Sequence, residues 1–230
     1  MPRPCLAILA LATLVSPGLS RQAQRGSPSS APQTVLENDY VSISQVDLAA
    51  GGKSSYTVPA GRSAVLIRLR RNLGLGRGSS ISSTALELDR IFFLNAGETS
   101  NYPDPKSGSG VDDREIRIEL KSPPPSGTFE KDAVTLDASH NNILFENDRV
   151  RVVDVHFGLG EKGPVVDKRP RVIILLNDMH ADVARHEGDP PSPRDGKAGV
   201  IQWSLGGSQA TMNRNETKLD NIVVEIKGKL

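Results

Sequence analysis

Apolar and polar residues alternate along two separate stretches of the chain, and in each stretch the alternation changes phase once. In the first stretch Val41 and Ile43 lie on one parity, whereas Val46 and Leu48 lie on the other. Alternation with a period of two is the pattern of a β-strand with one buried face. The second stretch repeats the pattern with Val150, Val152, Val155 and Phe157. A one-residue change of phase predicts a bend or a β-bulge at the same place in both strands.

Further short apolar runs predict more strands, and almost no segment shows the 3.6-residue period of a helix. The runs 64–67 and 172–176 are continuous and indicate fully buried strands. The other strands are expected at 85–88, 91–94, 116–120, 200–203 and 222–226. The predicted fold class is therefore all-β, with the many short strands of a small barrel or a double-sheet jelly roll.

The two alternating stretches belong to an internal repeat. Residues 35–41 (VLENDYV) and 144–150 (LFENDRV) align without a gap at an offset of 109 residues, since Glu146 follows Glu37 by that number. The same offset places Gly51 on Gly160, where each copy is expected to turn. An ungapped match over this length indicates two copies of one structural unit.

The flanking segments set the expected domain boundaries. Residues 1–20 combine one positive charge with a short apolar run, which is typical of a secretory signal peptide and too short for a bilayer span. Residues 21–33 are rich in Ser, Gly, Pro and Gln and predict a disordered tether. We expect a first domain at 34–121, a linker with three consecutive prolines at 122–142, and a second domain at 143–230.

Charge and cysteine content narrow the environment and the partners. The only cysteine, Cys5, lies in the expected signal peptide, so the exported chain would contain neither disulfides nor thiolate metal sites. Removal of the signal leaves 27 basic and 27 acidic residues, a balance that gives no overall attraction to nucleic acid. We expect a periplasmic or secreted protein with no membrane span.

Several motifs resemble the cupin superfamily. The Glu-Asn-Asp-x-Val segments, each followed by Gly-x-Lys and an apolar strand, look like the opening of a cupin domain. Residues 89–97 (DRIFFLNAG) resemble the second conserved cupin segment, and 200–204 with 223–227 resemble small exported cupin-like proteins. The resemblance covers nearly all of the chain after residue 33. It implies two tandem double-stranded β-helix (jelly-roll) barrels, a bicupin arrangement.

The metal ligands of the family are missing in both copies. The resemblance places the usual His-x-His pair at Thr57 and Pro59 in the first copy and at Val166 and Lys168 in the second. The histidine of the second motif becomes Ser100 in one copy and Gln209 or Ala210 in the other. Valine and a cationic lysine do not coordinate metals, so we expect no cofactor and none of the family's metal-dependent chemistry.

The histidines offer one alternative metal site. His180, Asp182 and His186 would share one face if this segment were a strand, which makes a surface site geometrically conceivable. An ordinary polar outer face explains the same alternation, with Ala181 and Val183 buried, and we favour it. His140 is expected in a loop, exposed to solvent.

One basic cluster and one set of cavity residues remain. Arg68, Arg70, Arg71 and Arg77 form a basic cluster that could bind an anion, but we expect them on the exposed face of a strand or at a sheet edge that they protect against aggregation. A barrel without its metal can keep a pocket lined by the replacement residues, so the ligand-binding candidates are Tyr56, Thr57, Ser100, Lys168, Gln209 and Asn213. Lys168 could bind a carboxylate, or act as a base if desolvation lowered its pKa. Its charged neighbours Asp167 and Arg169 favour the alternative of an exposed turn.

These observations predict an exported bicupin-like protein without a catalytic role, which binds a small ligand or serves in assembly. Its expected partners are a small molecule and further copies of itself. The alternative is a metal-independent enzyme, epimerase- or lyase-like, that acts on a carbohydrate or an organic acid. That alternative requires a general acid and a general base facing each other in one barrel, and no catalytic residue is assigned from the sequence.

Overall fold

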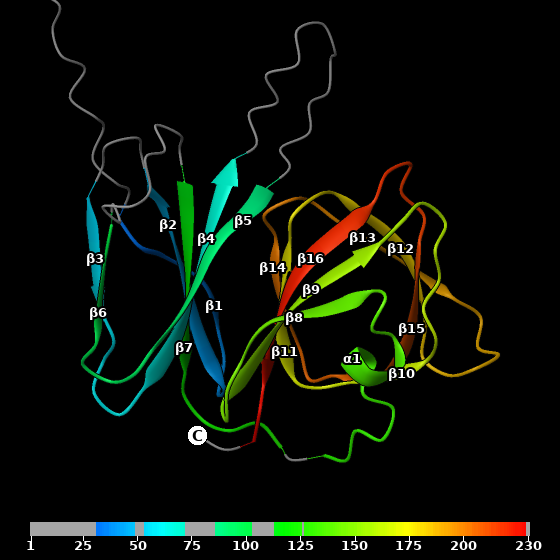
Figure 1. Cartoon of the computed structure of the whole chain (residues 1–230), viewed down its shortest axis with the longest axis horizontal. Helices are drawn as coiled ribbons and strands as arrows, with labels where there is room; N and C mark the ends of the chain where they lie inside the picture. Colours follow the sequence, from blue (N-terminus) through cyan, green and yellow to red (C-terminus); the bar gives the residue numbers. More distant parts are fainter. Residues whose placement is uncertain (1–30, 49–52, 72–85, 103–112, 126, 229–230) are drawn as a thin grey trace, which may run out of the picture.

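The structure, a computed structural model, describes residues 31–48, 53–71, 86–102, 113–125 and 127–228. Almost every regular element in these ranges is a β-strand, and the one helix, α1 (Ala133–Leu136), has four residues (Figure 1). The all-β prediction is therefore confirmed. No helix of the described residues is long and apolar enough to cross a membrane. The expected signal peptide, Gly51, Arg77 and most of the tether lie outside the described ranges.

The first copy of the repeat forms a five-stranded antiparallel sheet and a two-stranded one. The larger sheet has the order β1-β2-β7-β4-β5, and β3 pairs with β6. The bounds are β1 (Gln33–Glu37), β2 (Val41–Leu48), β3 (Ser54–Thr57), β4 (Ser63–Arg71), β5 (Leu86–Leu94), β6 (Thr99–Tyr102) and β7 (Asp113–Leu120).

The second copy repeats the five-stranded sheet and adds a four-stranded one. The sheet orders are β14-β11-β16-β9-β8 and β10-β15-β12-β13, so the larger sheets of both copies have the same topology. The bounds are β8 (Asn141–Glu146), β9 (Val150–Phe157), β10 (Val166–Lys168), β11 (Arg171–Leu175), β12 (Met179–Ala184), β13 (Ser192–Gly196), β14 (Ile201–Ser204), β15 (Gly207–Asn213) and β16 (Leu219–Ile226). The linker expected at 122–142 follows β7 and contains α1.

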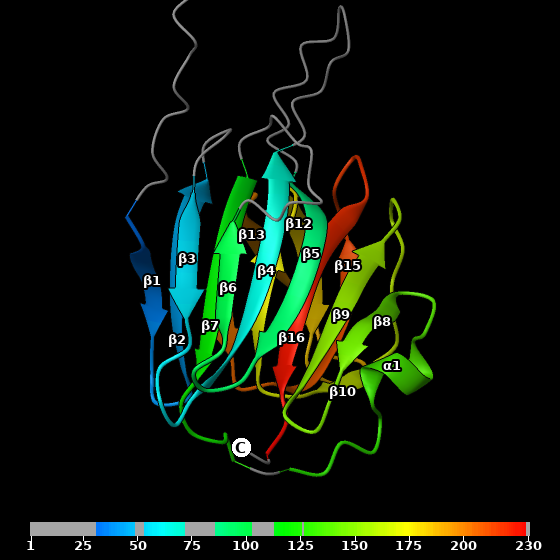
Figure 2. The same ribbon diagram turned by 60° about the vertical axis from the view of Figure 1, so that its left-hand side comes forward.

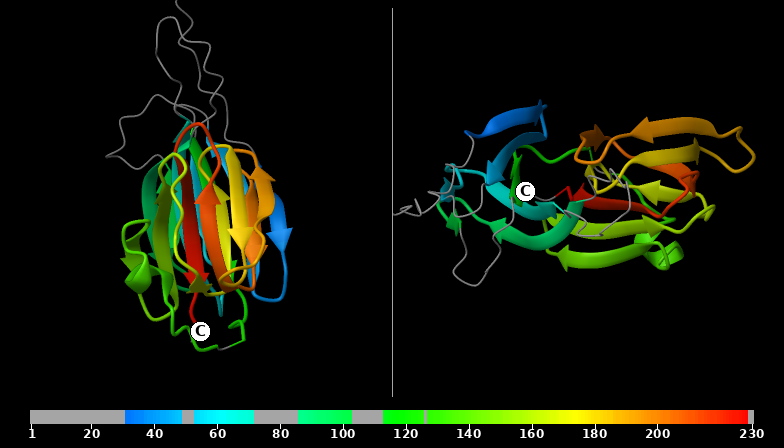
Figure 3. Two further views of the ribbon diagram at one scale, coloured as in Figure 1. Left: turned by 90° about the vertical axis from the view of Figure 1, so that its right-hand side faces the viewer. Right: turned by 90° about the horizontal axis from the view of Figure 1, so that it is seen from above.

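The two five-stranded sheets face each other and share one hydrophobic core. Buried residues from both copies pack in it, including Ile43 and Ile118 from the first and Val152 and Val224 from the second. Tyr40 stacks on Trp203 across the interface, with 5.5 Å between the ring centroids. The smaller sheets lie on the outer sides, which gives four layers (Figures 2 and 3).

The phase change seen in the sequence reflects burial on both faces rather than a bulge in these strands. Val41 and Ile43 of β2 belong to the shared core, whereas Val46 and Leu48 point into the first barrel. The pairing of β2 with β7, and that of β9 with β16, runs without a shift of register. The irregularities lie one strand earlier, in β1 after Thr34 and at the equivalent place in β8 after Ile143. The prediction of a bulge within β2 and β9 was therefore wrong, because the irregularities lie in the preceding strands β1 and β8.

The strands expected at 85–88 and 91–94 form one continuous strand, β5. Asp89 is the extra residue of a bulge, because Leu88 and Arg90 pair with consecutive residues of β4. The two polar residues between the apolar runs therefore mark a bulge and not a turn.

Candidate ligand-binding site

A cavity of about 740 Å³ lies inside the second barrel, between its five-stranded and four-stranded sheets. Alternate residues of β9 form one apolar side, Val153, Val155 and Phe157. Alternate residues of β12, Met179, Ala181 and Val183, form the other apolar side. The complete lining consists of Asn141, Val153, Val155, Phe157, Lys168, Arg171, Ile173, Met179, Ala181, Val183, Arg185, His186, Arg194, Asp195, Gln202, Trp203, Ser204, Gly206, Gly207, Ser208, Gln209, Thr211, Leu219, Asn221, Val223 and Glu225.

Two cations, Lys168 and Arg171, face this cavity from the adjoining ends of β10 and β11. Arg171 is 4% exposed. Burial, followed by the charge of Arg171, lowers the pKa of the Lys168 ammonium to about 8, although the charges of Glu225, Asp137 and Asp132 partly oppose this. Burial also lowers the pKa of Arg171 to about 10, although the charge of Glu225 partly opposes this. Both shifts mean that the charged forms of these side chains are poorly solvated.

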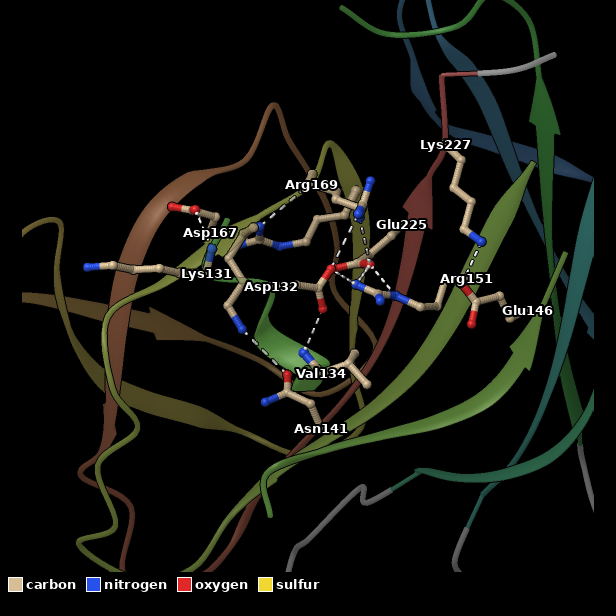
Figure 4. Close-up of polar contacts among 12 residues, drawn as sticks. Lys131, Asp132, Val134, Asn141, Glu146, Arg151, Asp167, Arg169, Glu225 and Lys227 are labelled. Carbon is tan, nitrogen blue, oxygen red and sulfur yellow. Dashed lines mark hydrogen bonds and ion pairs between the residues drawn. The ribbon is translucent and has the colours of Figure 1, made fainter. Parts of the chain in front are cut away.

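The nearby carboxylates are already engaged by other cations (Figure 4). Glu225 accepts a hydrogen bond of 2.7 Å from Nε of Arg151. Asp132 accepts from Arg151 at 2.9 Å and from Arg169 at 3.3 Å. Burial opposes ionisation of Asp132, but the hydrogen bond and charge of Arg151 outweigh it and lower the pKa of this carboxyl group. The network therefore satisfies Arg151, and within the described ranges it leaves Lys168 and Arg171 without an ion pair to a carboxylate.

In the part of the chain that the structure describes, Lys168 forms one hydrogen bond, from Nζ to Oδ1 of Asn141 at 3.5 Å. Asn141 is fixed in turn by donating to the carbonyl oxygen of Asp137 at 2.9 Å. Among the described residues, neither Lys168 nor Arg171 has a carboxylate oxygen within 4.0 Å. The sequence-based expectation of an exposed turn at Lys168 was wrong, because this residue ends strand β10 and borders the cavity.

The other candidates of the second barrel differ in their surroundings. Gln209 borders the cavity from β15. Asn213 does not, because its side-chain amide donates to the carbonyl oxygens of Phe157, Gly158 and Thr217. Asn213 therefore fixes the loops around β15 and has no donor left for a ligand.

The interior of the first barrel is occupied by its own side chains. Glu115 of β7 bridges Arg68 at 2.8 Å and Arg117 at 2.9 Å, and all three side chains are at most 6% exposed. Arg68 also lies over the rings of Phe92 and Tyr102. The expected exposure of Arg68 was therefore wrong, whereas Arg70 is partly exposed and pairs with Asp89.

The three ligand candidates of the first barrel belong to this packing or lie outside it. Ser100 accepts a hydrogen bond of 3.0 Å from Arg68, and the Tyr56 hydroxyl donates to Glu119 at 3.0 Å. Burial, followed by the charge of Glu119, raises the pKa of Tyr56. Thr57 is exposed and hydrogen-bonds to Thr99. None of the three borders the cavity of the second barrel.

The histidines do not form the alternative metal site. His180 points outward and pairs with Asp195 at 2.8 Å, while Asp182 pairs with Arg214 at 2.9 Å. His186 follows the end of β12 and borders the cavity. Within the described ranges, no group of three or more His, Cys, Asp or Glu side chains could hold a metal ion.

His140 is not the exposed loop residue that was expected. Its side chain is 13% exposed and lies 2.6 Å from Asp137, and its ring stacks on Phe157 with centroids 4.2 Å apart. His140 therefore packs against Phe157, which borders the cavity.

The residues at the family's metal positions do not fit a metal ion. Val166 is 1% exposed and has no donor atom. Lys168 presents an ammonium group beside a second cation. A positively charged cavity floor repels a divalent cation and favours an anion.

Sequence reasoning missed Arg171, Asn141 and Glu225 as cavity residues. The apolar run 172–176 gave the strand, but Arg171 comes one residue before it. The alternation along the strand could have identified it, because Arg171 and Ile173 are two residues apart, lie on the same face and both border the cavity.

Comparison with known proteins establishes the fold. No protein-family model matches the chain, and no curated protein matches its sequence. The putative glyoxylate-induced protein from Pseudomonas aeruginosa is 12% identical with a TM-score of 0.54, and the match covers 90% of this chain and 84% of that one. AerE from Microcystis aeruginosa is 13% identical with a TM-score of 0.50, covering 85% and 96% of the two chains. A cupin 2 conserved barrel domain protein from Leptotrichia buccalis is 10% identical with a TM-score of 0.44, covering 86% and 88%.

Sheet topology and cavity together define an all-β protein with two jelly-roll units and a cation-lined hollow in the second. The likeness to the proteins from Pseudomonas aeruginosa and Microcystis aeruginosa shows the fold, because each of these matches covers at least 84% of both chains.

Proposed function

We propose that this is an exported cupin-fold protein whose second barrel binds a small organic anion without a bound metal and without turning the anion over. The observation that carries the proposal is the pair Lys168 and Arg171, two poorly solvated cations that border one cavity and lack a carboxylate partner. A ligand carboxylate would supply the missing counter-charge.

The remaining cavity suits a small molecule of mixed polarity. Its volume of about 740 Å³ falls within the range of small-molecule sites. Val155, Phe157 and Ala181 offer an apolar surface to the body of the ligand, while Gln209 offers a hydrogen-bonding amide. Arg185 and Arg194 add positive charge to the lining.

We assign the first barrel a structural role. The buried Arg68–Glu115–Arg117 triad lies in its interior. Its larger sheet covers the apolar face of the second barrel. This division of labour accounts for a repeat that preserves the fold in both copies while opening a cavity in the second.

Binding can be measured by calorimetric titration, which needs no reporter group in the cavity. We expect lactate and pyruvate to release heat on binding. The neutral amide lactamide should bind at least about tenfold more weakly, since each charge-assisted hydrogen bond contributes about 1.5–3 kcal/mol.

Variants Lys168→Met and Arg171→Met should each weaken the carboxylate by about ten- to a hundredfold. Lys162→Met is the matched control, because Lys162 is an exposed lysine of the same barrel that does not border this cavity. Equal affinity for lactate and lactamide, or unchanged affinity in both cavity variants, would contradict the proposal.

A further inference from the structure

Lys168 carries a weakly held amine inside a protein cavity. Its Nζ has the single hydrogen bond of 3.5 Å to Asn141, at the upper limit for such a contact. Lysines on the surface of this protein are held more closely, as Lys227 is by Glu146 at 2.5 Å. The Lys168 amine can therefore reach a bound molecule without first breaking an ion pair.

The acidic groups that face Lys168 do not hold it as an ammonium. Asp137 is bonded to His140 at 2.6 Å, and Glu225 to Arg151 at 2.7 Å. Asp132 is bonded to Arg151 and Arg169. Burial and the neighbouring Arg171 charge lower the pKa of Lys168 to about 8. About a tenth of the amine is therefore neutral at pH 7.

A neutral, buried lysine amine is the group that attacks carbonyl carbons in proteins. Arg171 lies beside it on the same cavity wall and offers a guanidinium group to a carboxylate. A ligand that engages both groups presents a carbonyl carbon to Lys168 and a carboxylate to Arg171. A 2-oxo acid carries these two groups on adjacent carbons.

We infer that Lys168 captures a small 2-oxo acid as an imine while Arg171 holds the carboxylate. This inference rests on the anion-binding function proposed above and adds the class of ligand and a reversible covalent bond. The nitrogen lone pair of Lys168 forms a bond to the carbonyl carbon, and the carbon–oxygen double bond opens. The carbonyl oxygen leaves as water with the two hydrogens of the amine, which gives a carbon–nitrogen double bond. Addition of water reverses the step, so no oxidant or reductant is consumed.

The test is reductive trapping. The full chain without residues 1–20 is incubated with pyruvate and sodium cyanoborohydride at pH 7, and each lysine is examined by peptide mass mapping. We expect carboxyethylation of Lys168 at least about tenfold above that of any other lysine, because its neutral fraction is larger. Lys168→Met should remove the main adduct, and Lys162→Met should leave it unchanged.

Arg171→Met tests the anchoring role. It should lower trapping of pyruvate about tenfold and lower trapping of acetaldehyde, which has no carboxylate, much less. Thermal unfolding of each variant establishes that it is folded. The site of trapping in the wild-type protein is read from its own peptide map and does not depend on any variant.

Lactate separates the two proposals, because it has the carboxylate but no carbonyl. Lactate binding without selective trapping at Lys168 overturns the imine and leaves the anion site standing. Adducts spread evenly over surface lysines also overturn the imine. Failure of both lactate binding and trapping overturns both proposals.

Discussion

Arg171 is a buried cation and Lys168 a partly buried one, and in the described part of the chain neither forms an ion pair with a carboxylate. Such residues lower the stability of the native state. The unfavourable contribution depends on burial near a second cation. Groups with strongly shifted pKa values of this kind cluster at functional sites. The shifted pKa values of these two residues therefore support a binding site in the second barrel.

The lowered pKa of Lys168 predicts a pH-dependent stability. Between the folded pKa of about 8 and the model-compound value of 10.5, the unfolded chain binds more protons at this residue than the folded chain. The free energy of unfolding should therefore rise across this window, on the order of 3 kcal/mol from Lys168 alone, and fall again as pH returns below 8.

Lys168→Met should remove this rise, because the variant has no amine to titrate. Urea unfolding at pH 7.0–10.5 measures the difference between the two proteins, in which the contributions of Tyr56 and the other groups cancel. A difference that stays constant from pH 8 to pH 10.5 would show that Lys168 is not desolvated in the folded chain.

At this scale the sequence predicted part of the site. Counting from the cupin-like glycine identified Lys168 and Gln209, which the structure places at the cavity. It also selected Asn213, whose side-chain amide donates all of its hydrogen bonds to backbone carbonyl oxygens. Hydrogen-bond partners that are distant in sequence decide these outcomes, and spacing along a strand contains no information about them.

At the scale of the element, β7 shows why an alternating strand can be misread. Ile116, Ile118 and Leu120 point into the shared core, while the charged residues between them would suggest a solvent face. Glu115 is instead 2% exposed inside the first barrel. Alternation predicts a strand and its two faces, but the second layer that buries the polar face comes from β3 and β6.

We expect Glu115→Gln to destabilise the protein by about 3–5 kcal/mol, because it leaves Arg68 and Arg117 buried without their shared counter-ion. Urea unfolding measures the loss. Glu146→Gln is the control, since it breaks an exposed pair with Lys227 and should have a much smaller effect. Replacing the whole triad with Arg68→Met, Glu115→Leu and Arg117→Met should recover most of the loss. An equally small effect of Glu115→Gln and Glu146→Gln would contradict the buried network.

At the scale of the whole molecule, the two barrels are not independent units joined by a linker. The repeat and the strands were predictable because each copy has its own alternation. The shared core was not, because the residues that form it are the same apolar residues that any single barrel would be expected to bury within itself. The phase change in β2 and β9 is the trace that this interface leaves in the sequence, since each strand turns one face to its own barrel and the other to the opposite sheet.

The shared core predicts that both barrels unfold in one transition. Ile118 belongs to the first barrel and is fully buried among residues of both. Ile118→Ala should lower the free energy of unfolding by about 2–5 kcal/mol through the cavity that it leaves. Because the core is common, Trp203 fluorescence in the second barrel should report the same lowered midpoint as circular dichroism of the whole chain.

Leu66→Ala provides the matched comparison, because Leu66 is equally buried but packs inside the first barrel. It should shift the same single transition, with equal calorimetric and van't Hoff enthalpies. Two separate transitions, or a Trp203 midpoint that Ile118→Ala leaves unchanged, would show that the barrels fold independently. The filled first barrel could then no longer be regarded as the support that holds the cavity of the second in shape.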